Sequence, residues 1–228
     1  MGFVHAIVGP DHYLPFVAMA RAGDWPLRKT LLVTGACGLA HVLASVCVGA
    51  LGLWLGATVL KLGDLEAFRA DLASWALIAF GLLYTVWGVR RAIRNRPHVH
   101  VHVHADGTIH KHLHVHDQDH VHVHESPASG GRTKMRSLTP WVLFTIFLFG
   151  PCEPLIPLLM YGAVNGSAVD MGLVAGVFAL ATVGTMLIVV TVALRLTDAL
   201  PLSNLHRFGQ ATAGLIVLGC GVAMKFGL

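Results

Sequence analysis

Long apolar stretches separated by short polar breaks run along most of this 228-residue chain. About 20 consecutive, mainly apolar residues form a helix long enough to cross the hydrocarbon core of a bilayer. Six stretches approach or exceed that length, so the pattern predicts an all-α membrane protein with six transmembrane helices. The predicted spans are residues 3–21, 30–60, 65–89, 138–164, 169–194 and 205–226.

The amino-acid composition agrees with a membrane protein. Hydrophobic residues make up 55% of the chain and charged residues only 12%, whereas about a quarter of the residues in a soluble domain are charged. The first stretch has no basic start, and a Gly-Pro break replaces the apolar core of a signal peptide. We therefore expect it to remain as a span. The four cysteines lie inside predicted spans without a CxxC pair, so structural disulfides are not expected.

The basic residues predict an orientation. All but three of the sixteen lysines and arginines lie in or beside the connections after the first, third and fifth spans; the exceptions are Lys61, Arg69 and Lys225. Cytoplasmic connections carry the excess of basic residues. We therefore expect a multi-pass protein of the inner or plasma membrane with both termini outside. Because the basic residues flank spans rather than cluster on one soluble face, they do not indicate a nucleic-acid partner.

Two similar motifs divide the chain. GPDHYLPF at 9–16 and GPCEPLIPLL at 150–159 each begin with Gly-Pro and lie in the first span of a three-span half. Two such halves point in opposite directions, so the pattern predicts an inverted repeat, with 1–94 and 138–228 as the repeats and 95–137 as the loop between them. Paired broken helices mark the binding site of many transporters. The alternative is a pair of bent structural helices.

Ionisable and thiol side chains are concentrated near these two motifs. An ionisable group at membrane depth costs about 2.5–3.5 kcal/mol on insertion scales, so we expect these groups to converge. On a regular helix, positions 5 and 12 would lie about 10 Å apart along the axis. One ion could bind both histidines only where Gly9-Pro10 interrupts the helix. The candidate metal ligands are His5, Asp11, His12, His41, Cys152 and Glu153.

The ligand types favour nickel, cobalt, zinc or copper(II) over magnesium, calcium and manganese, which prefer oxygen ligands. A lone histidine such as His41 would more simply form a hydrogen bond between helices, but the presence of His5, Asp11 and His12 favours a metal site. Thr182 and Met186 lie where the second half would place its counterpart of His41. They either line an ion path or pack between helices.

HAIVGPDH at 5–12 resembles the H-x-x-x-x-D-H signature of the nickel/cobalt transporter superfamily, and GLAHVLAS at 38–45 resembles that family's LGHS-type segment in the next span. The resemblance extends to the UreH-type and RcnA-type branches. It implies that His5, Asp11, His12 and His41 recognise a nickel or cobalt ion carried as substrate, by a protein that is not an enzyme and holds no prosthetic group. This chain has one more residue between His5 and Asp11, and fewer predicted spans than the larger permeases.

Two other functions compete with transport. GPCEPLIPL at 150–158 is similar to the cysteine–proline motif of the CcdA/DsbD thiol-electron carriers, which need a cysteine in each half. Here the first half has Asp11 and His12 at the corresponding place. A membrane metal sensor or scaffold is the third interpretation. No nucleotide-binding motif is present, so a transporter would use an ion gradient or the metal gradient.

The loop between the halves contains HVHVHVHADGTIHKHLHVHDQDHVHVH at 98–124. Its histidines alternate with mainly apolar residues, which predicts three short antiparallel strands near 98–104, 109–116 and 120–124. A disordered histidine-rich linker is the alternative. Either form predicts a cytoplasmic site for several metal ions. RcnA-type exporters carry a similar loop, which slightly favours export. The loop ligands are His98, His100, His102, His104, His110, His112, His114, His116, His120, His122 and His124.

Overall fold

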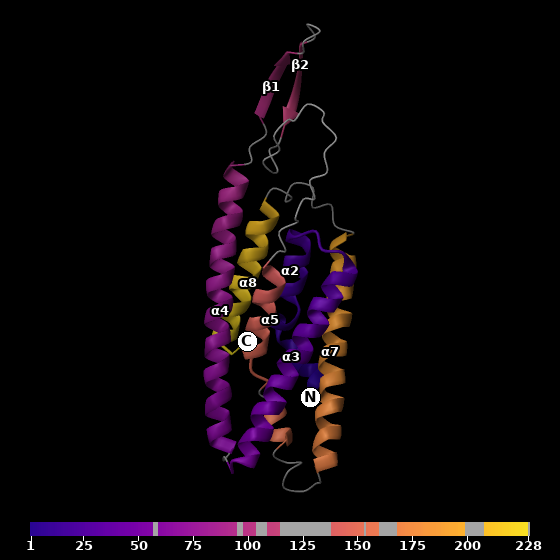
Figure 1. The fold of residues 1–228 in the computed structure, drawn as a ribbon, viewed down its shortest axis with the longest axis vertical. Coiled ribbons are helices and arrows are strands. Elements are labelled where there is room, and N and C mark those ends of the chain that lie inside the picture. The colour runs from indigo at the N-terminus through magenta and orange to yellow at the C-terminus, as the bar shows by residue number, and fades with distance from the viewer. Residues whose placement is uncertain are drawn as a thin grey trace, which may run out of the picture.

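The computed structural model describes residues 1–56, 59–94, 98–103, 109–114, 138–152, 154–159, 168–198 and 208–227. Its body is an elongated bundle of helices with a small hairpin beyond one end (Figure 1). The elements are α1 (Gly2–Val8), the 3-10 helix η1 (Pro10–His12), α2 (Leu14–Ala22), α3 (Leu27–Trp54), α4 (Val59–Arg94), β1 (His98–Val103), β2 (Ile109–His114), α5 (Thr139–Phe149), α7 (Ala168–Asp198) and α8 (Gly209–Lys225). Residues 155–159 are also helical.

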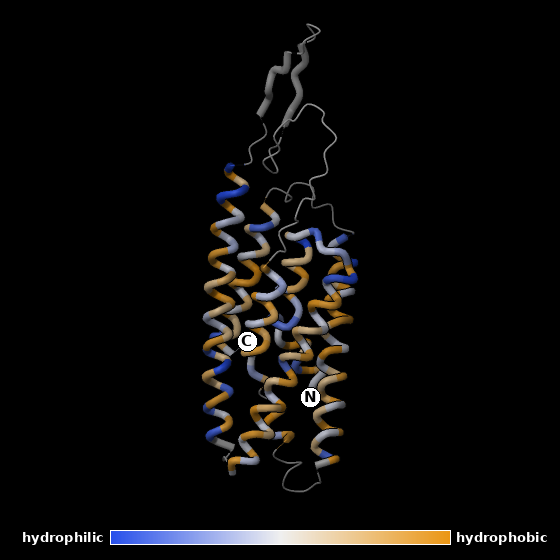
Figure 2. The backbone as a smooth tube through the Cα atoms, in the orientation of Figure 1, coloured by the Kyte–Doolittle hydropathy of each residue, from blue (hydrophilic) through white to orange (hydrophobic). Residues whose placement is uncertain are grey.

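Three helical stretches in the described part of the chain are long and apolar enough to cross a membrane, Leu27–Trp54, Lys61–Arg94 and Val169–Asp198. Two further apolar helices, α5 and α8, are shorter. Apolar residues cover much of the bundle, and polar ones gather toward both ends of α4 (Figure 2). These features support a helical membrane protein. The six spans, the inverted repeat and the orientation stay predictions.

Both Gly-Pro motifs interrupt a helix. The first predicted span consists of α1, η1 and α2, because Gly9 is extended (φ −82°, ψ 97°) and Pro10 begins a separate turn. The second motif ends α5 at Phe149, and Gly150 is extended (φ −58°, ψ 142°) before Pro151. Proline lacks a backbone donor and disfavours helical backbone in the preceding residue. The expected departure from helix at Gly9-Pro10 is therefore present.

The boundary between the second and third predicted spans was wrong. The predicted span 30–60 ends too late, because α3 stops at Trp54 and α4 begins at Val59. Gly56 adopts the left-handed conformation (φ +67°), which commonly ends a helix. The third predicted span begins too late, at 65, because the polar residues of the first α4 turns obscured a helix that the sequence pattern took for a connection.

Glycines bring α4 and α8 into backbone contact. A Cβ at Gly81 would overlap the backbone nitrogen of Leu218, and one at Gly214 would lie 2.5 Å from the backbone nitrogen of Thr85. Close approach of this kind, through small residues, is typical of helix packing in membranes. The contacts run in opposite directions along the two sequences, so the helices are antiparallel. An exposed ion pair between Lys225 and Asp71 joins them as well.

The hairpin pairs β1 with β2 in antiparallel register. His98, His100 and His102 lie opposite His114, His112 and His110, respectively. These strands fall within the first two predicted ranges. The third predicted strand, 120–124, lies outside the described residues, as do His104, His116, His120, His122 and His124.

We predict that Gly81→Ala lowers the stability of the bundle, because the new methyl group would collide with the α8 backbone. Overpacking of this kind costs about 1–3 kcal/mol, which corresponds to a fall in melting temperature of several degrees for a chain of this size. Thermal unfolding in detergent measures the change. Gly63→Ala on the same helix is the matched control, because its Cβ would meet nothing within 4 Å among the described residues. An equal effect of both substitutions would contradict the α4–α8 contact.

Candidate metal centre

Three histidines and one cysteine meet where the two breaks approach each other. His5 comes from α1, His12 from η1, His41 from the middle of α3, and Cys152 from the segment after α5. One ligand atom each of His5, His41 and Cys152 lies within 4.8 Å of the other two. The ring centroid of His12 lies 4.5 Å from that of His5 and 5.3 Å from that of His41. The break thus brings together two histidines that a regular helix would separate.

Asp11 orients the ring of His12. The Nδ1 atom of His12 lies 3.1 Å from Oδ1 of Asp11 and 3.2 Å from the carbonyl oxygen of Gly9. A proton on Nδ1 can serve these two acceptors, which leaves the lone pair of Nε2 available. That Nε2 atom is buried and has no hydrogen-bond partner among the described residues. Asp11 therefore stands behind the histidine, as the carboxylate does in many carboxylate–histidine–metal arrangements.

His41 is fixed in a similar way from another helix. Its Nδ1 donates to the carbonyl oxygen of Phe147 at 3.3 Å. Its Nε2 is buried without a hydrogen-bond partner in the described part of the chain. The interpretation of His41 as a bond between helices therefore accounts for only one of its two nitrogens. A buried imidazole nitrogen with no partner is costly, and a bound cation would satisfy it.

Two cavities adjoin this cluster. The larger, of about 360 Å³, is lined by His5, Asp11 and His12 together with Pro151 and Pro154. The smaller, of about 20 Å³, lies against Asp11, His41 and Pro151. A cavity of more than roughly 10–15 Å³ by this measure holds one water-sized occupant. The larger cavity therefore borders the cluster at His5 and His12, and the smaller one borders it at His41.

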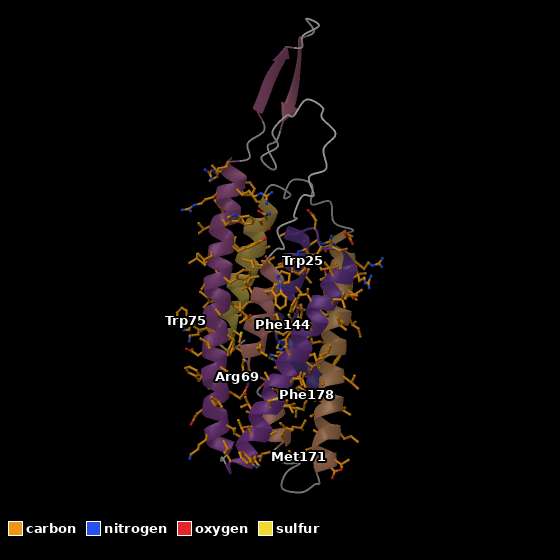
Figure 3. All side chains as sticks on the ribbon, in the orientation of Figure 1. Trp25, Arg69, Trp75, Phe144, Met171 and Phe178 are labelled. Carbon is orange, nitrogen blue, oxygen red and sulfur yellow. The ribbon has the colours of Figure 1, made fainter. Side chains whose placement is uncertain are left out.

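Aromatic side chains form the dry walls of the cluster. Phe178 of α7 packs 6.3 Å from His5, measured between ring centroids, and Phe147 packs 6.2 Å from His41. Phe16 packs against Phe147 at 4.7 Å. The labelled side chain of Phe178 lies between α7 and α3 in Figure 3. Such walls strengthen the electrostatic attraction between a bound cation and its ligands, because they exclude water.

Sequence reasoning missed a buried charged pair beside Cys152. Glu66 and Arg69, one turn apart on α4, form an ion pair and contact Ser45 of α3. Arg69 lies within the predicted third span, where it was counted only among the basic residues of the exterior side, and it is only 8% exposed. Figure 3 places its side chain on the inner side of α4, whereas Trp75 lies on the outer side. Opposite charges three residues apart at the start of an apolar helix were the available signal.

The remaining predicted residues divide into two groups. Glu153 lies outside the described residues, and the side chains of the loop histidines are not described, so their roles stay predictions. Thr182 and Met186 are fully buried on α7. Met186 lies against Gly38 of α3, and Thr182 lies against Gly2 of α1. These contacts favour the interpretation of both residues as packing residues.

The donor atoms of His5, His41 and Cys152 are spaced as ligands of one transition-metal ion could be, and the ring of His12 lies beside them. Ligand nitrogens at about 2.1 Å and a sulfur at about 2.3 Å from a tetrahedral ion lie roughly 3.5 Å from one another. The Nε2 of His5 lies 3.9 Å from the Sγ of Cys152, so a small movement would bring these two atoms to that separation. Comparison with family models, curated proteins and solved structures finds no match for this chain.

We predict that cobalt added to the full-length protein produces a thiolate-to-cobalt charge-transfer absorption, because a metal-bound thiol loses its proton. Cys152→Ser should abolish this absorption. Cys220→Ser, which alters a buried cysteine of α8, should leave it intact. Titration followed by near-ultraviolet absorption is the measurement. Retention of the band in Cys152→Ser would exclude Cys152 as a ligand.

Proposed function

We propose that this protein transports a divalent transition-metal ion across a membrane, with nickel or cobalt as the cargo. One observation carries the proposal: three imidazoles and a thiol converge where two Gly-Pro breaks meet. Two of the imidazoles also have a buried Nε2 without a partner among the described residues. The site lies in a body whose helices are suited to a membrane. A metal ion is the ligand that such a group of donors binds best.

Transport, rather than storage of a fixed ion, is supported by the backbone around the site. Non-helical backbone at membrane depth is tolerated where it lines a cavity or contacts protein. The first break does line the cavity of about 360 Å³. In the proposed arrangement, six spans form two inverted three-helix repeats, and each repeat contributes one break. Movement of one repeat against the other would expose the site to each side in turn.

The ligand types narrow the cargo. Imidazole nitrogen and thiolate sulfur bind nickel, cobalt, zinc and copper well, whereas magnesium and calcium need oxygen ligands. Asp11 adds negative charge next to His12. The proposed site therefore rejects the abundant hard cations through its ligand types. Nickel and cobalt are proposed ahead of zinc and copper because segments 5–12 and 38–45 resemble motifs of the nickel/cobalt transporter superfamily.

The hairpin has a separate role in this proposal. The register of β1 and β2 places histidine opposite histidine at three alternate pairs. Residues opposite each other in an antiparallel pair lie close enough to interact, so in this proposal each pair would offer two ligands to one ion. The loop would collect or buffer metal on the cytoplasmic side, beside the path and not within it. Export is slightly favoured, and its energy source would be an ion gradient or the metal gradient itself.

We predict that His12→Ala and His41→Ala each reduce the initial rate of nickel or cobalt flux into proteoliposomes by at least about tenfold, since even indirect supports of a metal ligand change affinity by 10–100-fold. Tyr13→Phe is the matched control. It alters the residue next to His12 but removes only an exposed hydroxyl contact with the Ile7 carbonyl. Its flux should stay close to that of the parent protein.

Near-normal flux in both histidine variants would remove this cluster from the transport path. Metal binding without any flux in the parent protein would instead favour a sensor or scaffold. Thiol-disulfide exchange without metal flux would favour an electron carrier. The same preparations can be assayed for all three activities.

We predict that deletion of residues 98–124 lowers the number of bound ions but leaves flux at saturating metal nearly unchanged. Eleven histidines, at two to four per ion, would hold about three to five ions. Loop binding should fade as the pH falls below about 6.5, the reference pKa of histidine. Calorimetric titration, paired with flux at low and saturating metal, tests both points. Loss of saturating flux, with the helices still folded, would place the loop within the ion path.

A further inference from the structure

We propose that Glu66 and Arg69 are positioning residues that fix the second Gly-Pro break and hold the Cys152 thiol at the metal centre. The inference rests on the proposed metal site and adds a device that controls its sulfur ligand. Both residues belong to α4, which contributes no ligand itself. Their side chains reach across to the backbone on either side of Pro151.

The end of α5 creates the need for such a device. The last carbonyl groups of a helix have no partners within it. Pro151 has no N–H, and Gly150 is extended, so the chain cannot continue the helical hydrogen bonds. In an apolar environment each carbonyl left unpaired is costly. The segment between α5 and residue 155 therefore depends on donors from other helices.

Arg69 supplies those donors. Its Nη2 donates to the carbonyl oxygens of Leu148 and Gly150, each at 3.1 Å. Its Nη1 pairs with Glu66 and also lies 3.2 Å from the hydroxyl oxygen of Ser45. A planar guanidinium carries five donors in a fixed fork, so it can serve two carbonyls and a carboxylate at once in a defined geometry. One side chain therefore completes the end of α5 and fixes the direction in which the chain leaves it.

Glu66 holds the other side of the proline. Its Oε2 accepts a hydrogen bond from the backbone N–H of Cys152 at 3.2 Å. This N–H is the first backbone donor after Pro151, and the same residue carries the thiol that lies 3.9 Å from Nε2 of His5. The ion pair thus joins the backbone before the proline to the backbone after it. The position of the sulfur atom follows from that connection.

Stability alone does not explain this arrangement. Replacing a buried ion pair by apolar residues is often neutral or stabilising, because desolvation offsets the attraction between the charges. A pair retained at 1% and 8% exposure, with its hydrogen bonds directed at the backbone of a ligand, instead supplies geometry. Without it, the thiol would leave its place, and cobalt would be held by the three imidazoles.

The test compares the full-length protein with Glu66→Gln/Arg69→Met, which removes both charges together. Asp71→Asn/Lys225→Met is the matched control, since it removes the exposed ion pair between α4 and α8. Thiolate-to-cobalt absorption per mole of protein is measured at saturating cobalt, with melting temperature as the check on folding. We expect the first variant to lose the band while it still binds cobalt, and the control to keep it.

A folded Glu66→Gln/Arg69→Met variant with the parent's full band would overturn the proposal. Should that variant fail to fold, Glu66→Asp decides in the same way, because the shorter carboxylate keeps its charge but draws back from the Cys152 N–H. Loss of the band in Glu66→Asp supports positioning, and an unchanged band overturns it. Absence of the band in the parent protein would be a failure of the metal site itself, which distinguishes the two proposals.

Discussion

Backbone groups that two prolines leave without helical partners are the constraint on which the metal centre depends. At Gly9-Pro10 the chain meets that constraint locally, because η1 and the ring of His12 use the Gly9 carbonyl. At Gly150-Pro151 it uses other helices, with Arg69 serving two carbonyls and His41 a third. The same hydrogen bonds that satisfy the backbone therefore orient the side chains that face one another at the centre.

The two breaks consequently differ in what they tolerate. The first is stabilised by residues within a few positions of it, so its conformation depends on a short segment of the sequence. The second relies on α3 and α4, which are distant from it in sequence. It also relies on the charged pair of α4, which contacts Ser45 and the Cys152 backbone. Burial of that pair is acceptable because Oε2 of Glu66 and both Nη atoms of Arg69 have backbone or hydroxyl partners.

Much of the site could be predicted from the sequence, and the reasons are specific. His5, His12 and His41 are ionisable residues in apolar stretches, and Gly9-Pro10 signals the break that allows the first two to meet. Cys152 stands directly after the matching Gly-Pro. Glu66 and Arg69 could not be found in the same way, because the predicted third span contains them but the apolar pattern does not show that they face each other and a distant backbone. Only the packed structure shows that they turn inward and act on a distant backbone.

The contact between α4 and α8 has a mechanical consequence. Backbones that meet through Gly81 and Gly214 have no side-chain layer between them that could slide or repack. The two helices are therefore expected to move together as one rigid unit, and Arg69 and Glu66 belong to that unit. His41 and His5 stand on α3 and α1, which both pack on α7. Any shift of the α4–α8 pair against α7 would move the Cys152 sulfur away from the imidazoles. The affinity of the site for a metal ion therefore depends on the relative position of the α4–α8 pair and α7.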